Sequence, residues 1–249
     1  MDYWQLALLT LTGAAAGWIN VLAGGGSMLT VPVMVFLGLP GPVANGTNRI
    51  AIIAQNIVAV WRFFRGGFSN FRLSATLALA ASVGAFAGAQ VGVKLEGEWF
   101  NRVLAAIMLG VLVLMATGRK GALKNNREGD ARNLVLGHML MIGAGFWGGF
   151  IQIGVGFLLM PILYRVMGLD LIRVNMHKVF IVLVFSFVAL AVFASKVDIR
   201  WDMGAALALG NALGGWLGAR SSVQKGESLI KPALYAALVA MSIKLLFFQ

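Results

Sequence analysis

The sequence predicts an all-α integral membrane protein built from two inverted helical repeats, each containing a glycine-broken helix or hairpin. Three observations support this fold class. Hydrophobic residues make up 59% of the 249 residues and charged residues only 12%, about half the charged share of a typical soluble domain. Long runs lack Asp, Glu, Lys and Arg altogether, and the second half of the chain repeats landmarks of the first half.

The first uncharged run extends from residue 3 to residue 48. One straight helix of that length would be about twice as long as the ~30 Å hydrocarbon core of a bilayer. The run is interrupted at Gly24-Gly25-Gly26-Ser27, and Pro32 stands early in the helix expected next. Glycines end a helix easily, so the run turns back or breaks there. The sequence leaves open whether the break forms a hairpin or interrupts a single span.

Further apolar segments complete each half of the chain. In the first half they lie at about 44–64, 73–93 and 99–118. The second half restarts with an uncharged run over 133–164, interrupted at Gly154-Val155-Gly156, and continues at about 171–195, 203–220 and 232–248. We therefore expect a first transmembrane repeat over 1–118, a cytoplasmic linker over 119–132, and a second transmembrane repeat over 133–249.

Landmark residues of the two halves match at a nearly constant spacing. They are Trp18 with Trp147, Gly25 with Gly154, Pro32 with Pro161, and, one residue further apart, Asn45 with Asn175, Gly84 with Gly214 and Gly88 with Gly218. Chance would not produce this set in the same order. The chain therefore contains an internal repeat.

The basic residues favour an inverted repeat. If each break forms a hairpin, each half has an odd number of membrane elements, and the second half is inverted. Most Lys and Arg then lie on one side, and only Lys94, Arg102, Lys196 and Arg200 lie on the other. Short cytoplasmic loops carry an excess of Lys and Arg. The predicted topology therefore places the linker in the cytoplasm and both termini outside.

Several classes of function lack the residues they need. All nine acidic residues fall in loops or near the ends of spans, which disfavours cation transport or a carboxylate proton relay. The chain has no cysteine and two histidines, so we expect no metal site, no cofactor and no enzyme. The net charge of +11 fits a membrane protein with basic loops, so we expect no nucleic-acid partner.

The two glycine breaks are the first candidate binding elements. They contribute Gly25, Gly26 and Ser27 in the first half, and Gln152, Gly154 and Gly156 in the second. A helix that begins just after a break directs free backbone N–H groups and a positive partial charge toward it. Glycine also lets a ligand approach the backbone closely. Two such breaks at matching positions predict an anion site.

A second polar cluster opens the apolar helix that follows each break. The first half supplies Asn45, Thr47, Asn48 and Arg49, and the second half supplies Asn175, His177 and Lys178. Ionisable residues within the membrane usually face a cavity or a partner. No acidic residue stands near Arg49 or Lys178 in the predicted spans, so an anionic substrate would balance their charge. His177 is the side chain expected to titrate near neutral pH.

Residues 17–32, together with the stretch Ala44-Asn45-Gly46-Thr47-Asn48, resemble the signature of the sulfite exporter TauE/SafE family. The second half supports the resemblance through Gly154-Val155-Gly156, Asn175 and Lys178, so it covers nearly the whole chain. The resemblance implies a multi-pass permease of the bacterial-type inner membrane that carries small sulfur-containing or organic anions, such as sulfite or a sulfonate.

The resulting hypothesis is a secondary transporter that works by alternating access. Lys178 and Arg49 would balance the substrate charge, the amides and Thr47 would bind its oxygens, and His177 would couple transport to protons. The expected partners are a small anion and the lipid bilayer, and a homo-oligomer is left open. The alternatives are an anion channel and, with less support from the residues, a membrane subunit of a redox complex.

Overall fold

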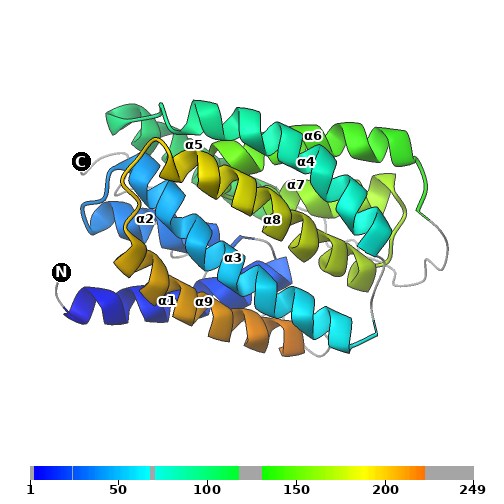
Figure 1. The fold of residues 1–249 in the computed structure, drawn as a ribbon, viewed down its shortest axis with the longest axis horizontal. Helices are drawn as coiled ribbons and strands as arrows, with labels where there is room; N and C mark the ends of the chain where they lie inside the picture. The colour runs from blue at the N-terminus through cyan, green and yellow to red at the C-terminus, as the bar shows by residue number, and fades with distance from the viewer. Residues whose placement is uncertain (1–2, 24, 68–70, 118–130, 222–249) are drawn as a thin grey trace.

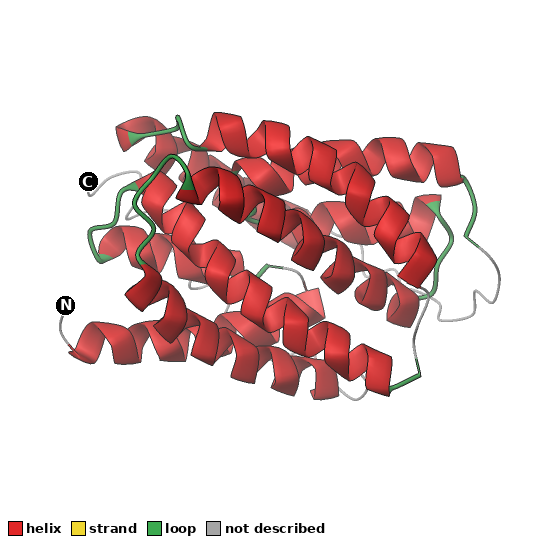
Figure 2. Ribbon diagram, in the orientation of Figure 1, coloured by secondary structure: helices red, strands yellow, loops and turns green. Residues whose placement is uncertain are grey.

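The computed structural model describes residues 3–23, 25–67, 71–117 and 131–221, and within these ranges the chain forms helices and loops without a strand (Figure 2). The all-helical class is therefore confirmed for the described residues. The expected last segment, 232–248, and nearly all of the linker 119–132 lie outside them.

The helices follow the predicted segments closely. The first half contains α1 (Tyr3–Ala23), α2 (Ser27–Phe36), α3 (Gly41–Arg65), α4 (Phe71–Gly92) and α5 (Gly97–Thr117). The second half contains α6 (Leu134–Phe150), α7 (Val155–Pro161), the π-helical turn η1 (Ile162–Val166), α8 (Leu171–Ala194) and α9 (Trp201–Ser221). Both predicted breaks therefore fall between helices, α1 and α2 in one half and α6 and α7 in the other.

The chain reverses direction at the first break. A Cβ atom on Gly26 would collide with the carbonyl oxygen of Ala16 and with Asn20, so the start of α2 lies directly against α1. At its other end, α2 leads to Leu37, which lines a surface cleft together with Gln5 near the start of α1. The 10 residues of α2 span about 15 Å at 1.5 Å per residue. The first break is therefore a hairpin whose returning arm is too short to cross a bilayer.

The second break has the same geometry. The backbone N–H of Arg132 donates to Met167 at 2.9 Å, and the Asn133 side chain donates to Val166 at 3.0 Å. These bonds hold the start of α6 beside the end of η1. The 7 residues of α7 and the 5 of η1 span about 18 Å at 1.5 Å per residue, so this arm is also too short to cross a bilayer.

Helices from different halves pack side by side. α1 packs along α9, and α6 packs along α4. Glycines permit both contacts: a Cβ on Gly84 of α4 would collide with the Ile142 carbonyl of α6, and a Cβ on Gly214 of α9 would collide with the Ala14 carbonyl of α1. α3 and α8 contact each other between these pairs, and they begin at opposite ends of the bundle (Figure 1).

The outer faces of α4 and α9 are apolar. Exposed large side chains recur at helical spacing on these faces, namely Leu79, Val83 and Phe86 on α4 and Leu209, Leu213 and Leu217 on α9. By length and composition, α4 and residues 172–194 of α8 are the two described helices apolar enough to cross a membrane. The tryptophans Trp4, Trp61, Trp99 and Trp201 are exposed near helix ends, where membrane proteins place interfacial anchors.

Candidate functional site

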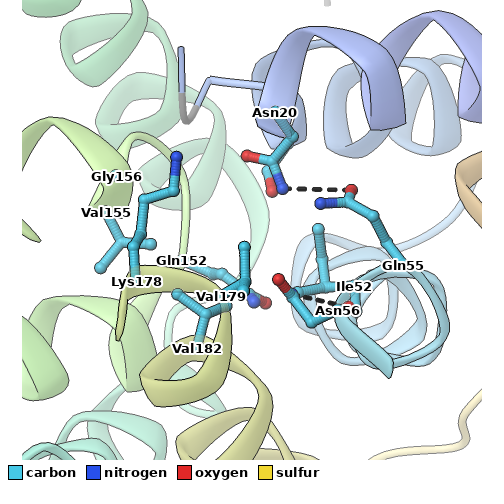
Figure 3. Close-up of a pocket in the computed structure, with 11 residues that line it drawn as sticks. Asn20, Ile52, Gln55, Asn56, Gln152, Val155, Gly156, Lys178, Val179 and Val182 are labelled. Carbon is cyan, nitrogen blue, oxygen red and sulfur yellow. Dashed lines mark hydrogen bonds between the residues drawn. The ribbon is translucent and has the colours of Figure 1, made fainter. Parts of the chain in front are cut away.

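A small cavity lies where the two breaks approach each other. A Cβ on Gly25 would lie 3.3 Å from the Phe157 ring, so the first break touches α7. The cavity has a volume of ≈ 20 Å³, room for about one water molecule. Its lining comes from both halves (Figure 3): Asn20, Ser27, Ile52, Gln55, Asn56, Gln152, Val155, Gly156, Lys178, Val179 and Val182.

Lys178 is the charged residue of this lining. Its helix, α8, begins at Leu171 because the Asp170 side chain accepts hydrogen bonds from the backbone N–H groups of Ile172 and Arg173 at 2.9 and 3.0 Å. Lys178 lies two turns further along and is only 3% exposed. Its Nζ donates to the Val21 carbonyl at 3.3 Å and to Asn175 Oδ1 at 2.9 Å. An ammonium group has three donors, so one remains beyond these two bonds.

Side-chain amides face Lys178 across the cavity (Figure 3). Asn20 Nδ2 donates to Gln55 Oε1 at 3.1 Å, and Asn56 Nδ2 donates to the Ile52 carbonyl at 2.8 Å. From the second break, Gln152 Nε2 donates to Ser186 Oγ at 3.0 Å. Gln152 has a positive φ of 62°. Residues other than glycine rarely adopt this backbone conformation, and those that do cluster at functional sites.

Arg49 is buried but does not line the cavity. Its guanidinium donates to the carbonyls of Gly148 and Gly149 at 3.1 and 2.5 Å, and it lies 4.6 Å from the centre of the Phe193 ring. Asn45 stands one turn before it and donates to the Phe150 carbonyl at 2.8 Å. Both side chains therefore bind the last residues of α6.

Three further predicted residues form hydrogen bonds away from the cavity. Thr47 Oγ1 accepts a hydrogen bond from the backbone N–H of Arg200 at 3.2 Å, and Asn48 Oδ1 accepts one from Thr30 Oγ1 at 2.6 Å. His177 Nδ1 lies 2.8 Å from Ser74 Oγ. None of the three lines the cavity.

The structure therefore divides the predicted site residues into three groups. Ser27, Gln152, Gly156 and Lys178 meet in the cavity, and Asn175 joins them through Lys178. The glycines Gly25, Gly26 and Gly154 shape the breaks. The remaining predicted residues, Asn45, Thr47, Asn48, Arg49 and His177, form buried hydrogen bonds outside the cavity.

Two polar lining residues on α3 were not among the predicted site residues. Gln55 and Asn56 lie on α3, where they interrupt an apolar stretch of the sequence two turns after Asn48. A polar pair inside an apolar span was the signal that could have identified them. Asn20, which precedes the first break, completes the amide group.

The cavity has no acidic residue in its lining. The acidic side chains in ion pairs are at helix ends, where Glu98 pairs with Arg102, Asp170 with Arg173 and Asp202 with Arg200. The described residues contain no group of three or more His, Cys, Asp or Glu that could hold a metal ion. The charge facing the cavity is therefore positive.

Comparison with known proteins identifies relatives that match nearly the whole chain. The chain is 26% identical to a probable membrane transporter protein, ORF9, of a Sinorhizobium species, with 97% of this chain and 92% of the relative covered. It is 25% identical to a probable membrane transporter protein of Haemophilus influenzae, with 98% and 95% covered, and 25% identical to the probable membrane transporter protein YfcA of Escherichia coli, with 97% and 90% covered.

No solved structure matches the chain. The names of the relatives indicate a membrane transporter rather than an enzyme. The model of one family, described as sulfite exporter TauE/SafE, matches residues 9–245, nearly the whole chain. This protein is therefore a membrane protein that belongs to the sulfite exporter TauE/SafE family.

Proposed function

We propose that this membrane transporter is a secondary transporter of a small sulfur-containing or organic anion, such as sulfite or a sulfonate. The observation that carries the proposal is the position of Lys178: a buried ammonium group on a cavity between two broken helices, with amides around it and no carboxylate in the lining. The family description, sulfite exporter, supports the choice of anion.

The chemistry of the cavity suits an oxyanion. A buried charge is costly unless it is paired, and the bound anion would supply the missing negative charge beside Lys178. The side chains of Asn20, Gln55, Asn56 and Gln152 carry N–H groups that can donate to its oxygens. Ser27 adds a hydroxyl at the start of α2.

The size of the cavity favours a transporter over a channel. A volume of ≈ 20 Å³ holds about one water molecule, whereas sulfite has a sulfur atom and three oxygens. Binding therefore requires the walls to separate, which is what alternating access provides. A channel would need a continuous opening for conduction.

An inverted repeat would supply that movement, and two observations support it. In Figure 1, α1 and α3 begin at one end of the bundle, whereas α6 and α8, their matches in the repeat, begin at the other. The pairing of α1 with α9 is also matched by the pairing of α6 with α4. Inverted repeats with broken helices and a midplane site are common in secondary transporters. A multi-pass location in the inner membrane follows from this proposal.

Flux measurements in proteoliposomes test the proposed function. Purified protein is reconstituted, and uptake of radiolabelled sulfite is measured with and without unlabelled sulfite inside the vesicles. A carrier gives saturable uptake that internal sulfite accelerates. Non-saturable uptake that follows the membrane potential would support the channel alternative. An absence of protein-dependent flux for sulfite, sulfoacetate and thiosulfate would contradict the proposed substrate class.

A further inference from the structure

Each broken helix ends inside the protein, which creates a physical problem. The last four carbonyl groups of an α-helix have no partner within the helix. At the ends of α1 and α6 they belong to or lie near buried residues such as Val21 and Gly149. Buried polar groups without partners are costly, and the carbonyl end of a helix also carries negative partial charge. A cation at each of these ends would solve both problems.

The end of α6 is held from the first half of the chain. Three successive carbonyls receive donors from α3: Arg49 donates to Gly148 and Gly149, and Asn45 donates to Phe150 at 2.8 Å. Arg49 also lies 3.5 Å from Asn45 Oδ1, so the two side chains support each other. Together they satisfy most of the carbonyls that α6 leaves open before the second break.

The end of α1 is held from the second half. Lys178 on α8 donates to the Val21 carbonyl at 3.3 Å and to Asn175 Oδ1 at 2.9 Å. Asn45 and Asn175 occupy matching positions in the repeat, and each accepts a hydrogen bond from a cation one turn later on its own helix. The same arrangement therefore occurs twice, with the halves exchanged.

We propose that Arg49 and Lys178 are reciprocal caps, each of which fixes the broken helix of the opposite half of the protein. Arg49 is then a positioning residue, which acts on the site through the end of α6 and the adjacent Gln152. Lys178 combines two roles, because it caps α1 and also lines the cavity.

The two caps differ in a way that matters for transport. This step rests on the proposed function. An anion that enters the cavity attracts Lys178. The anion therefore competes with the Val21 carbonyl for the N–H donors of the Lys178 ammonium group. Arg49 lies outside the cavity lining and against the Phe193 ring, so its cap remains in place. Anion binding would therefore loosen the end of α1 while the end of α6 stays fixed.

Hydrogen–deuterium exchange of the full-length protein, without any anion, tests the reciprocal caps. The variants are Arg49→Met and Lys178→Met, with Arg102→Gln as a control because Arg102 pairs with Glu98 at an exposed helix end. We expect Arg49→Met to speed exchange at residues 151–156 by about fivefold or more, and Lys178→Met to do the same at residues 25–29. Each effect thus falls in the half opposite to the substitution.

Two further variant types keep the test decisive. Asn45→Ala removes the hydrogen bond to the Phe150 carbonyl and the one accepted from Arg49, and Asn175→Ala removes the one accepted from Lys178. Both variants preserve the two cations, so they report the same crossed pattern if a methionine variant does not fold. Arg49→Lys is expected to restore slow exchange at residues 151–156, because an ammonium group can still donate to the carbonyls. Faster exchange confined to the substituted helix, or spread uniformly over the protein, would overturn the proposal. Since no anion is present, this outcome is independent of whether the protein transports sulfite.

Discussion

At the residue scale, Lys178 and His177 are neighbours in sequence with different surroundings. The Lys178 side chain reaches the cavity and the end of α1. His177 points to α4, where Ser74 Oγ lies 2.8 Å from Nδ1, while Nε2 is buried and has no hydrogen-bond partner. A histidine near a substrate site, with an open ring nitrogen, can couple proton binding to movement between α4 and α8.

The coupling hypothesis predicts a change in the pH dependence of flux. Sulfite flux in proteoliposomes is measured between about pH 5 and pH 8, the range in which histidine commonly titrates. His177→Gln is expected to flatten the pH profile, because glutamine can bond to Ser74 but cannot take up a proton. His138→Gln is the matched control, since His138 is partly exposed, does not line the cavity, and has its Nδ1 2.7 Å from the Leu134 carbonyl of its own helix. If His177→Gln retains the wild-type profile, His177 does not couple protons.

The sequence predicted which residues are polar within the membrane, but it did not predict their partners. The positions of Lys178, Asn175 and Gln152 near one cavity follow from the repeat, because matching breaks were expected to meet. The bonds of Arg49 could not be predicted. Its acceptors are backbone carbonyls of Gly148 and Gly149, which lie far along the chain, and carbonyls leave no signal in a sequence.

At the element scale, close backbone contact holds the helix pairs together. A Cβ on Gly145 of α6 would collide with the Ala81 carbonyl of α4, and one on Gly149 would collide with the Ala85 carbonyl. Small residues of this kind allow membrane helices to approach closely. The sequence showed the small residues on α4 and α9 but did not show that their partners are α6 and α1.

A pair of substitutions on α6 tests this packing. Gly145→Ala is expected to destabilise the protein by about 1–3 kcal/mol, the usual range for overpacking, because backbone carbonyls cannot move aside as a side chain can. Gly143→Ala is the control on the same helix, since a Cβ there would meet nothing within 4 Å. Thermal unfolding in detergent measures both. Equal unfolding temperatures for the two variants would show that α4 and α6 are not in close contact.

The sequence did not decide whether each break forms a hairpin or interrupts a single span, and the reason is physical. A glycine break ends a helix, but it does not specify the direction of the next one. The structure supplies the direction through tertiary contacts, such as the hydrogen bond from Arg132 to Met167. Such contacts join residues on either side of a long apolar run, and apolar periodicity alone does not reveal them.

At the scale of the whole molecule, the account predicts a defined topology. Arg72 near the start of α4 and Lys196 after the end of α8 are exposed. The start of α4 and the end of α8 lie at opposite ends of the bundle (Figure 1). The positive-inside rule places Arg72 in the cytoplasm and Lys196 outside. Because the native chain has no cysteine, single cysteines can be introduced without further changes.

Labelling of these single cysteines tests the topology. In intact spheroplasts, a membrane-impermeant maleimide is expected to label Lys196→Cys, and to label Arg72→Cys only after the membrane is permeabilised. The two variants serve as controls for each other. Labelling of both from the same side would contradict the proposed arrangement of the helices in the membrane.

The central claim is that an anion binds beside Lys178, and ligand-dependent thermal stability tests it most directly. Wild type and Lys178→Ala are heated with increasing sulfite, sulfate, thiosulfate, sulfoacetate, taurine or acetate. A ligand that binds only the folded protein stabilises it by an amount that grows with the logarithm of its concentration above the dissociation constant. We expect at least one sulfur oxyanion or sulfonate to raise the unfolding temperature of the wild type but not of the variant. An equal rise in both proteins, or no rise in the wild type with any of these anions, would contradict the claim.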